Sequence, residues 1–394
     1  MKRMNTMNTM KKYFVSLLMI LLMVTSLSGV FADGNIKLII DGSEINEGAK
    51  PVVVKGVTLL PLRLVSEKLG GVVTWSAEFQ RATINTAAFE VVFRVNEKKY
   101  FVNGVSKDLE VTPQVVEGNV MIPIRAFGDA INARVAYDSK NRVAKVDYFM
   151  AMAGNLKITG STTVQPIAQA AADRLMKANK YINIAVAGGG SGTGVKDTIA
   201  GTNNIGMSSR ALTTDEANKI SAVPIADDGI AIIVHPSNGV KNLTKEQARK
   251  IFLGEIKNWK DVGGDNAPIL VQTRETGSGT RASFEEMLLD KKSIVGTATP
   301  APSSALILQA VAKNTNAIGY DSVGFVDKSV HIVTIDNVAP TATTVNKGQY
   351  ALGRGLFMLY NGKPKGPTAV FIDYLRTMEV QKEIIIKEGF LSLY

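Results

Sequence analysis

The sequence contains no cysteine and only two histidines, His235 and His331. Without cysteine the chain can form no disulfide, no thiolate metal site, no cysteine nucleophile and no lipid linkage through sulfur. The two histidines are far apart in the sequence and lie in apolar, strand-like contexts. The sequence therefore gives little support for a histidine metal site or a Ser-His-Asp triad. We predict no metal, no other cofactor and no catalytic residue.

Long apolar runs are also scarce, and the most prominent one lies near the start. The run from Val15 to Val24 follows a basic segment and precedes the small-residue site Val30-Phe31-Ala32. This order is typical of a secretory signal, and the run is short for a membrane span. We expect residues 1–32 to be a signal, with an uncleaved anchor as the alternative. The protein is then secreted to the outer face of the cytoplasmic membrane or the cell wall, and it is not a lipoprotein.

Basic residues are in excess, but only mildly. The formal net charge is +10, and the signal carries four of these charges and no acid, which leaves about +6 for the mature chain. Such a bias suits an anionic ligand or an anionic cell wall. Because no basic block is interleaved with aromatic residues, the sequence does not predict a nucleic-acid partner.

Residues 36–148 repeat themselves with an offset of 62 residues. The repeated landmarks are glycines, prolines, an arginine and an aromatic residue. The matched pairs are Gly42 and Gly104, Pro51 and Pro113, Gly56 and Gly118, Pro61 and Pro123, Arg63 and Arg125, and Trp75 and Tyr137. Each copy reads as short strands around one helix, and the helices are expected at 62–69 and 124–131. Two such copies predict one pseudo-symmetric α+β domain or a pair that shares strands.

The repeat resembles the N-terminal-like domain of copper amine oxidases, through its Pro-x-Arg helix start and the turn before Trp75 and Tyr137. The resemblance implies a fold rather than an activity, because nothing in the sequence offers clustered histidines for copper. Arg63 and Arg125 recur at the same place in both copies, which favours a structural role over ligand binding. We expect residues 33–149 to form a spacer or attachment module.

After a short junction at 149–155, strands alternate with helices, which predicts an α/β fold with largely parallel sheets. Three strand-to-helix turns in this region are rich in glycine and hydroxyl groups. They are Gly160-Ser161-Thr162-Thr163, the run from Gly188 to Gly194, and the run from Arg274 to Arg281. The helices after them are expected at 164–180, 195–200 and 282–289. The carboxyl edge of such sheets is where α/β folds bind ligands.

The chemistry of these turns suits a tetrahedral oxyanion. The first N–H groups of a helix have no partner inside the helix, and the macrodipole adds roughly half a positive charge there. Glycines let the backbone approach the anion, hydroxyls add donors, and Arg274 or Arg281 can supply a full charge. The lysine-Ser/Thr ending of a Walker loop is missing, and no acidic residue is placed to bind a ribose, so a nucleotide is not predicted.

Residues 155–394 resemble the phosphate-binding subunits of bacterial phosphate ABC importers. The stretches that carry the resemblance are GSTTVQP at 160–166, GGGSGTGV at 188–195, IGMSSR at 205–210, DGIAIIVHPSN at 228–238, IFLGEIKNWKDVGG at 251–264, RETGSGTRASFE at 274–285 and AIGY at 317–320. The resemblance implies a type II, two-lobed periplasmic-binding-protein fold over residues 150–394. Lobe I would comprise about 155–232 and 352–394, and lobe II about 236–350, with hinge closure around the ligand.

The resemblance also implies a phosphate site made of backbone N–H groups, hydroxyls and one arginine. The implied ligands are Thr162, Thr163, Ser191 and Ser209 from lobe I and Arg274, Ser278, Gly279 and Thr280 from lobe II. Glu275 is expected to orient Arg274 or to face solvent.

Some family members carry aspartate where this chain has Ser209. An ionised carboxylate only accepts hydrogen bonds, so it favours the proton on phosphate and rejects unprotonated sulfate, whereas serine discriminates less. Asp228 is a candidate for that proton acceptor, and a strand-entry or cap role for it is the alternative.

We therefore expect a secreted, monomeric, non-catalytic protein that captures inorganic phosphate and delivers it to the permease and ATPase subunits of an ABC importer. A cell-surface, adhesion or phosphate-sensing protein, bound to the cell wall through residues 33–149, is a second possibility, motivated by the front domain and the missing lipid-anchor cysteine. Phosphoester hydrolysis is the enzymatic alternative, although no metal cluster and no obvious base accompany Ser161 or Ser278.

Overall fold

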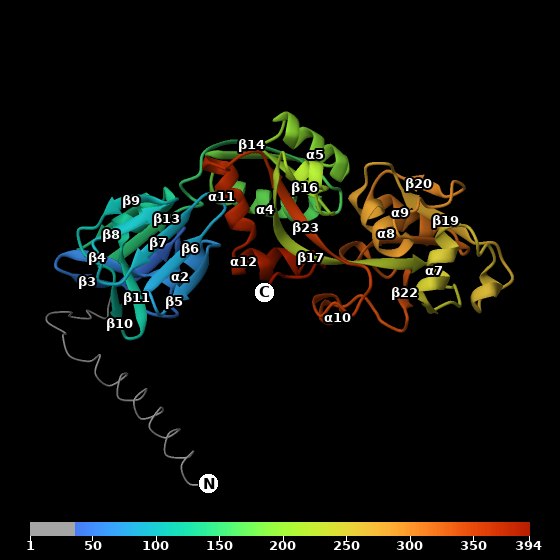
Figure 1. Cartoon of the computed structure of the whole chain (residues 1–394), viewed down its shortest axis with the longest axis horizontal. Coiled ribbons are helices and arrows are strands. Elements are labelled where there is room, and N and C mark those ends of the chain that lie inside the picture. Colours follow the sequence, from blue (N-terminus) through green and yellow to red (C-terminus); the bar gives the residue numbers. More distant parts are fainter. Residues whose placement is uncertain (1–35) are drawn as a thin grey trace, which may run out of the picture.

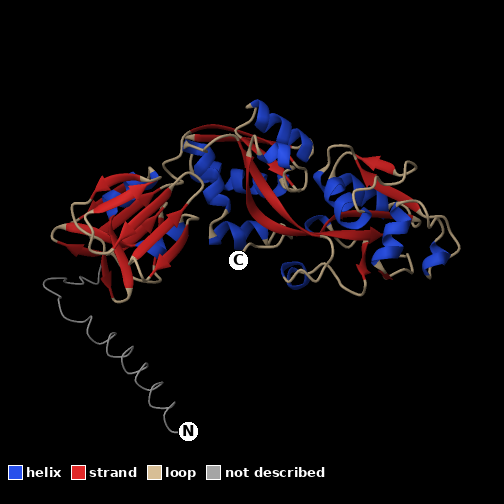
Figure 2. Ribbon diagram, in the orientation of Figure 1, coloured by secondary structure: helices blue, strands red, loops and turns tan. Residues whose placement is uncertain are grey.

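The computed structural model describes residues 36–394, so the expected signal lies outside the described residues. The described chain forms three units in a row, a front domain followed by two lobes (Figure 1). The front domain is built mainly of strands, whereas both lobes place helices around their strands (Figure 2).

The front domain contains two short helices among its strands. Its elements are β1 (Lys37–Ile40), β2 (Ser43–Ile45), β3 (Val52–Val54), β4 (Val57–Pro61), α2 (Leu62–Lys68), β5 (Val72–Ser76), β6 (Arg81–Asn85), β7 (Glu90–Arg94), β8 (Lys99–Val102), β9 (Val105–Asp108), β10 (Gln114–Val116), β11 (Asn119–Pro123), α3 (Ile124–Ile131), β12 (Arg134–Asp138) and β13 (Val143–Asp147). Both predicted helices are confirmed. Gly70, just beyond α2, has a φ of +77°, a left-handed conformation that glycine adopts readily.

The two sequence copies exchange strands around a pseudo-twofold axis. β4 pairs antiparallel with β11, its counterpart in the second copy, with Leu60 opposite Ile122. β1 of the first copy pairs with β13 of the second. β8 and β9 of the second copy join the sheet of β5 and β6 through the additional strand β7. Pseudo-symmetry and strand sharing, the two alternatives from the sequence, therefore occur together.

The two lobes alternate strands and helices along the chain. Their elements are β14 (Gly154–Gly160), α4 (Gln165–Ala178), β15 (Ile182–Ala187), α5 (Ser191–Ala200), β16 (Ile205–Ser208), α6 (Thr214–Ala217), β17 (Ser221–Val234), β18 (Asn242–Leu243), α7 (Lys245–Phe252), η1 (Trp259–Val262), β19 (Leu270–Arg274), α8 (Gly279–Leu289), β20 (Thr299–Ala301), α9 (Ser304–Ala312), β21 (Ala317–Ser322), η2 (Val323–Phe325), β22 (His331–Ile335), α10 (Ala342–Asn346), β23 (Gly353–Tyr360), α11 (Gly366–Leu375), α12 (Met378–Val380) and η3 (Gln381–Ile385).

One path of strands runs through both lobes, in the order β15-β14-β16-β23-β17-β21-β19-β20. The outer pairs are parallel: β14 with β15 and β16, and β19 with β20 and β21. The central strands β17 and β23 pair antiparallel with each other and with their neighbours. The prediction of largely parallel sheets is therefore right for the outer part of each lobe and wrong for the centre, where the two crossing strands run against their neighbours.

β17 and β23 connect the lobes (Figure 1). β17 is 14 residues long and passes from lobe I into lobe II, and β23 brings the chain back. Gly229 and Gly353 lie opposite each other in this pair. Two adjacent strands with facing glycines form a narrow connection, which is the kind of element about which two lobes can rotate.

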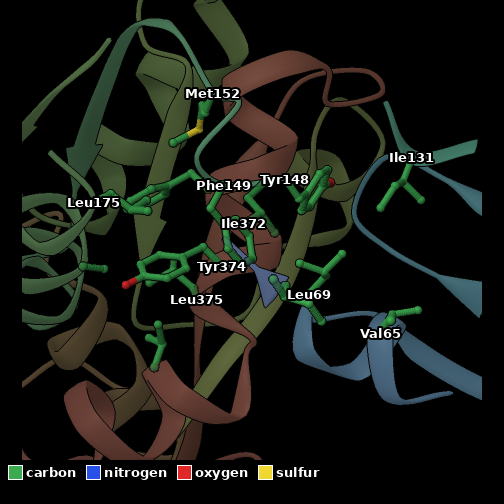
Figure 3. Close-up of a cluster of buried hydrophobic side chains, with 14 of the residues drawn as sticks. Val65, Leu69, Ile131, Tyr148, Phe149, Met152, Leu175, Ile372, Tyr374 and Leu375 are labelled. Atoms are coloured by element: carbon green, nitrogen blue, oxygen red, sulfur yellow. The ribbon is translucent and has the colours of Figure 1, made fainter. Parts of the chain in front are cut away.

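The front domain packs directly on lobe I (Figure 3). One buried apolar cluster includes Leu69 and Ile131 from the front domain and Leu175 and Ile372 from lobe I. The Phe149 ring lies between the rings of Tyr148 and Tyr374, at centroid distances of 5.3 and 5.0 Å. The junction at 149–155 is thus not a free linker. Its apolar residues Phe149 and Met152 are 6% and 4% exposed because they belong to the core that joins the two units.

Candidate functional site

Four strand-to-helix turns meet between the lobes. Three of them are the predicted turns that follow β14, β15 and β19. The helix after the second turn, α5, begins at Ser191 rather than at the predicted Val195. The glycines of this turn serve close packing: a Cβ on Gly194 would lie 2.5 Å from the Met207 carbonyl oxygen. The fourth turn leads from β20 into α9, which begins at Ser304.

Arg274 occupies the centre of the site and is 1% exposed. Glu275 accepts two hydrogen bonds from it, from Nε at 3.0 Å and from Nη2 at 3.1 Å. The outer nitrogens also reach hydroxyls of both lobes, with Nη1 3.0 Å from Ser304 Oγ and Nη2 3.0 Å from Thr162 Oγ1. Glu275 thus orients the guanidinium, so that its positive charge faces the hydroxyl groups of the cleft.

The other predicted ligands form two groups of buried hydroxyls. In the first, Thr163 Oγ1 lies 3.0 Å from Thr280 Oγ1 and 3.4 Å from Ser304 Oγ. In the second, Ser191 Oγ lies 3.3 Å from Ser209 Oγ and accepts a hydrogen bond of 3.0 Å from the Ser209 backbone N–H. Hydroxyls can donate or accept, so both groups can turn their protons toward an anion.

Ser278 and Gly279 connect these groups. Ser278 is the N-cap of α8, and its hydroxyl accepts a hydrogen bond from the Arg281 backbone N–H. A Cβ placed on Gly279 would lie 2.1 Å from Ser191 Oγ and 2.7 Å from Ser209 Oγ. The start of α8 therefore sits directly against both serines of lobe I, and only glycine leaves room for that approach.

The two lobes are in contact across the cleft. The Gly192 N–H donates to the Gly277 carbonyl at 2.9 Å, and the Ser283 hydroxyl donates to the Ser209 carbonyl at 3.3 Å. Together with the bond from Arg274 to Thr162, these contacts define a closed arrangement. The structure therefore brings the eight implied ligands together at one place between the lobes.

Asp228 lies at the edge of this site and is fully buried. Arg354 donates to its Oδ2 through Nε at 2.9 Å, and Ser322 donates to its Oδ1 at 2.6 Å. Burial raises the pKa of Asp228, whereas the Arg354 guanidinium lowers it. Arg354 also donates to the Ser209 carbonyl at 2.9 Å. Asp228 thus reaches the cleft through Arg354, and its role as an acceptor for the phosphate proton stays a prediction.

Three residues at or beside the site were missed by sequence reasoning: Ser304, Arg354 and Asp321. Asp321 is a fully buried acid of β21 whose pKa is raised by burial and lowered by the charge of Arg274. Ser304 carried a usable signal, because Ser303-Ser304 before an apolar run is a typical helix start. Asp321 and Arg354 lie on strands, without a glycine turn to mark them.

Neither histidine belongs to the two hydroxyl groups of the cleft. His235 hydrogen-bonds with Ser237, and His331 is the first residue of β22. Within residues 36–394 no group of three His, Cys, Asp or Glu side chains could hold a metal ion. In the same part of the chain, no helix is long and apolar enough to cross a membrane.

Two lobes joined by crossing strands, with an arginine and hydroxyls between them, define a substrate-binding protein for an oxyanion. Residues 150–378 match the PBP superfamily domain, and residues 39–146 match the Copper amine oxidase N-terminal domain. The phosphate-binding protein PstS of Bacillus subtilis is 34% identical over 246 residues, which cover 61% of this chain and 81% of that protein. The PstS of Borreliella burgdorferi is 30% identical, with coverage of 60% and 90%.

Solved structures agree with these relatives. A structure from Clostridium perfringens with bound phosphate, assigned as a phosphate ABC transporter substrate-binding protein, is 35% identical with a TM-score of 0.58 and covers 61% of this chain and 100% of that chain. An ABC-type phosphate transport receptor from Vibrio cholerae is 36% identical with a TM-score of 0.53, covering 60% and 99%. The chain belongs to the PBP superfamily and, within it, to the PstS family of phosphate-binding proteins.

Proposed function

We propose that this protein captures inorganic phosphate between its lobes and delivers it to the permease and ATPase subunits of an ABC importer. The observation that carries the proposal is the buried Arg274, which Glu275 orients so that its outer nitrogens meet hydroxyls of both lobes. A phosphate bound there would receive a charge-assisted bond and several hydroxyl and N–H bonds, and it would hold the lobes together. The named functions of the relatives support the same ligand.

Calorimetric titration of the purified protein with phosphate and with sulfate, each at pH 5 and pH 8, tests the proposal. We expect saturable phosphate binding at one site. Weak or absent sulfate binding would indicate that Asp228 or a neighbour accepts the phosphate proton, whereas equal binding would indicate that Ser209 has relaxed the selectivity. Absence of heat with both anions would overturn the proposal.

The proposal describes a binding protein without catalysis. The hydroxyls of the cleft bond with each other, with backbone groups or with Arg274. The two acids paired with arginines there are also engaged, Glu275 with Arg274 and Asp228 with Arg354. Turnover of a chromogenic phosphomonoester by the purified protein would contradict this.

We propose further that the mature protein is a monomer at the outer face of the cytoplasmic membrane or in the cell wall, retained through residues 33–149. The front domain is proposed as the anchor because it is a separate domain that the phosphate site does not use. The mild basic excess that fits an anionic wall belongs to the mature chain as a whole, since residues 33–149 alone are nearly neutral. Because the front domain shares its core with lobe I, the whole protein is the right object for the test. Sedimentation with purified cell walls should deplete it from solution, and recovery of all protein in the wash would contradict wall attachment.

A further inference from the structure

Asp321 is a buried acid beside the anion site that the proposed function does not use. It lies on β21 and is fully buried. Its Oδ1 accepts a hydrogen bond of 2.8 Å from the Ser322 backbone N–H. Its Oδ2 has no partner with hydrogen-bond geometry among the described residues. Leaving a buried acceptor without a partner costs free energy, so such an atom calls for an explanation.

The surroundings of Asp321 connect it to the ligands of the cleft. Burial raises the pKa of Asp321, whereas the charge of Arg274, the Ser304 hydroxyl and the charge of Arg354 lower it, because each favours the carboxylate form. Ser304 is also the residue that accepts from Arg274 Nη1 at 3.0 Å and lies 3.4 Å from Thr163 Oγ1. A single residue, Ser304, therefore links Asp321 to two implied phosphate ligands.

Ser304 has one proton to donate, which makes the link sensitive to the charge of Asp321. With Asp321 ionised, the Ser304 hydroxyl is drawn toward the carboxylate and away from Thr163. The negative charge also offsets the positive potential of Arg274, and because both side chains are buried, their electrostatic interaction is strong. With Asp321 protonated, the carboxyl group can donate a hydrogen bond instead of accepting one, and the positive charge of Arg274 acts on the anion without that offset.

We propose that Asp321 is a positioning residue that couples phosphate binding to proton uptake, acting through Ser304 and Arg274. The inference rests on the proposed function. The charged groups around Asp321 are Arg274 and its partner Glu275 at the end of β19, and Arg354 of β23 with its partner Asp228 of β17. Helix α9, which packs on the same side, supplies Ser304 and no charged side chain.

The direction of the pH effect follows from the pKa of Asp321. Burial, the largest cause, raises this pKa to about 7. Below that pH the group is neutral, and above it the group adds a negative charge behind Arg274. Because an anion binds better to the neutral form, phosphate affinity should fall as pH rises through about 7, and binding below that range should need no added proton.

The test compares the wild-type protein with Asp321→Asn, which keeps the shape and removes the titration. Phosphate titrations are run from pH 5.5 to pH 8.5, in pairs of buffers that differ in ionisation enthalpy, so that the protons taken up on binding are measured. Because phosphate titrates in the same way in both experiments, the difference between the two proteins reports on the protein alone. We expect wild-type affinity to fall about tenfold more than that of the variant, the effect of a one-unit pKa coupling.

Asp373→Asn is the matched control. Asp373 is equally buried, and burial raises its pKa to about 7 as well, but it lies at the front-domain junction. This variant should keep the wild-type pH profile and proton uptake. If wild type binds phosphate and Asp321→Asn shows the same pH profile and proton uptake, the coupling is overturned while the proposed function stands. If wild type gives no phosphate heat at any pH, both fall.

Discussion

Lobe I has two neighbours, and it meets them through opposite kinds of surface. Toward lobe II it presents hydroxyls and glycine, such as Thr163 and Gly192, which bond across a closed cleft. Toward the front domain it presents large apolar side chains, among them Tyr374 and Ile372, which join the aromatic pair at 148–149 in one core (Figure 3).

The difference explains which junction can open. Hydroxyl and N–H groups that part from each other find water as a partner, so the net free energy lost per bond is small. Apolar surface gains nothing from water, and each buried Å² that is exposed costs roughly 25 cal/mol. Lobe II can therefore separate from lobe I with each binding cycle, whereas the front domain moves with lobe I as one body.

The largest effect is expected from breaking the apolar junction with Phe149→Ala. Removing a buried phenylalanine should lower the free energy of unfolding by about 3–5 kcal/mol, since transfer and cavity costs add. Urea unfolding followed by circular dichroism measures this. Phe79→Ala is the control, because Phe79 is 56% exposed and its loss should change little. Equal stability of the two variants would show that the front domain is not anchored by this core.

A smaller effect, on binding rather than folding, is expected at the polar junction from Arg274→Gln. The variant loses the positive charge and its charge-assisted bonds, and we expect phosphate affinity to drop about a hundredfold, since each such bond contributes about 1.5–3 kcal/mol. Calorimetry measures the affinity, and thermal unfolding without phosphate checks the fold.

Arg134→Gln is the control for the loss of a paired arginine. Arg134 bonds with Asp147 at 3.2 Å in the front domain, away from the cleft. Its affinity for phosphate should equal that of the wild type. Full phosphate affinity in Arg274→Gln would show that the anion binds elsewhere.

The two junctions also differ in how well the sequence predicts them. The repeat with its two helices, and the turns at 160–163, 188–194 and 274–281, could be predicted because glycines, prolines and hydroxyls mark them locally. The shared core at Phe149 and Met152 could not, because an apolar run between two domains looks like a linker until both partners are in place. A Phe-Met-x-Met segment is nevertheless unusually apolar for a linker.

The missed site residues have a similar physical reason. Ser304, Asp321 and Arg354 reach the cleft from three separate segments, and their roles depend on how β17, β21 and β23 pair. Alternation along one strand predicts which side a residue faces, but not which charged group from another strand will face it. Asp321 in particular reads locally as an ordinary strand residue, and only its burial beside Ser304 distinguishes it.

The smallest effect is expected from adding one methyl group at the polar junction, with Gly279→Ala. Gly279 has no left-handed backbone conformation, so alanine fits α8 itself and the stability of lobe II should be unchanged. In the closed arrangement, however, the added Cβ would lie 2.1 Å from Ser191 Oγ, which no real contact permits. The two lobes then cannot close fully. We expect phosphate affinity to fall about tenfold, which corresponds to the loss of roughly one hydrogen bond.

Gly296→Ala is the matched control for this change, because a Cβ there meets nothing within 4 Å. Calorimetry of both variants, with small-angle X-ray scattering with and without phosphate, separates binding from closure. Wild type and Gly296→Ala should become more compact with phosphate, while Gly279→Ala should do so less. If Gly279→Ala closes and binds like wild type, then contact between the start of α8 and the serines of lobe I is not needed for the bound state. The polar junction would then tolerate a looser fit than its geometry indicates, in contrast to the apolar junction on the other side of lobe I.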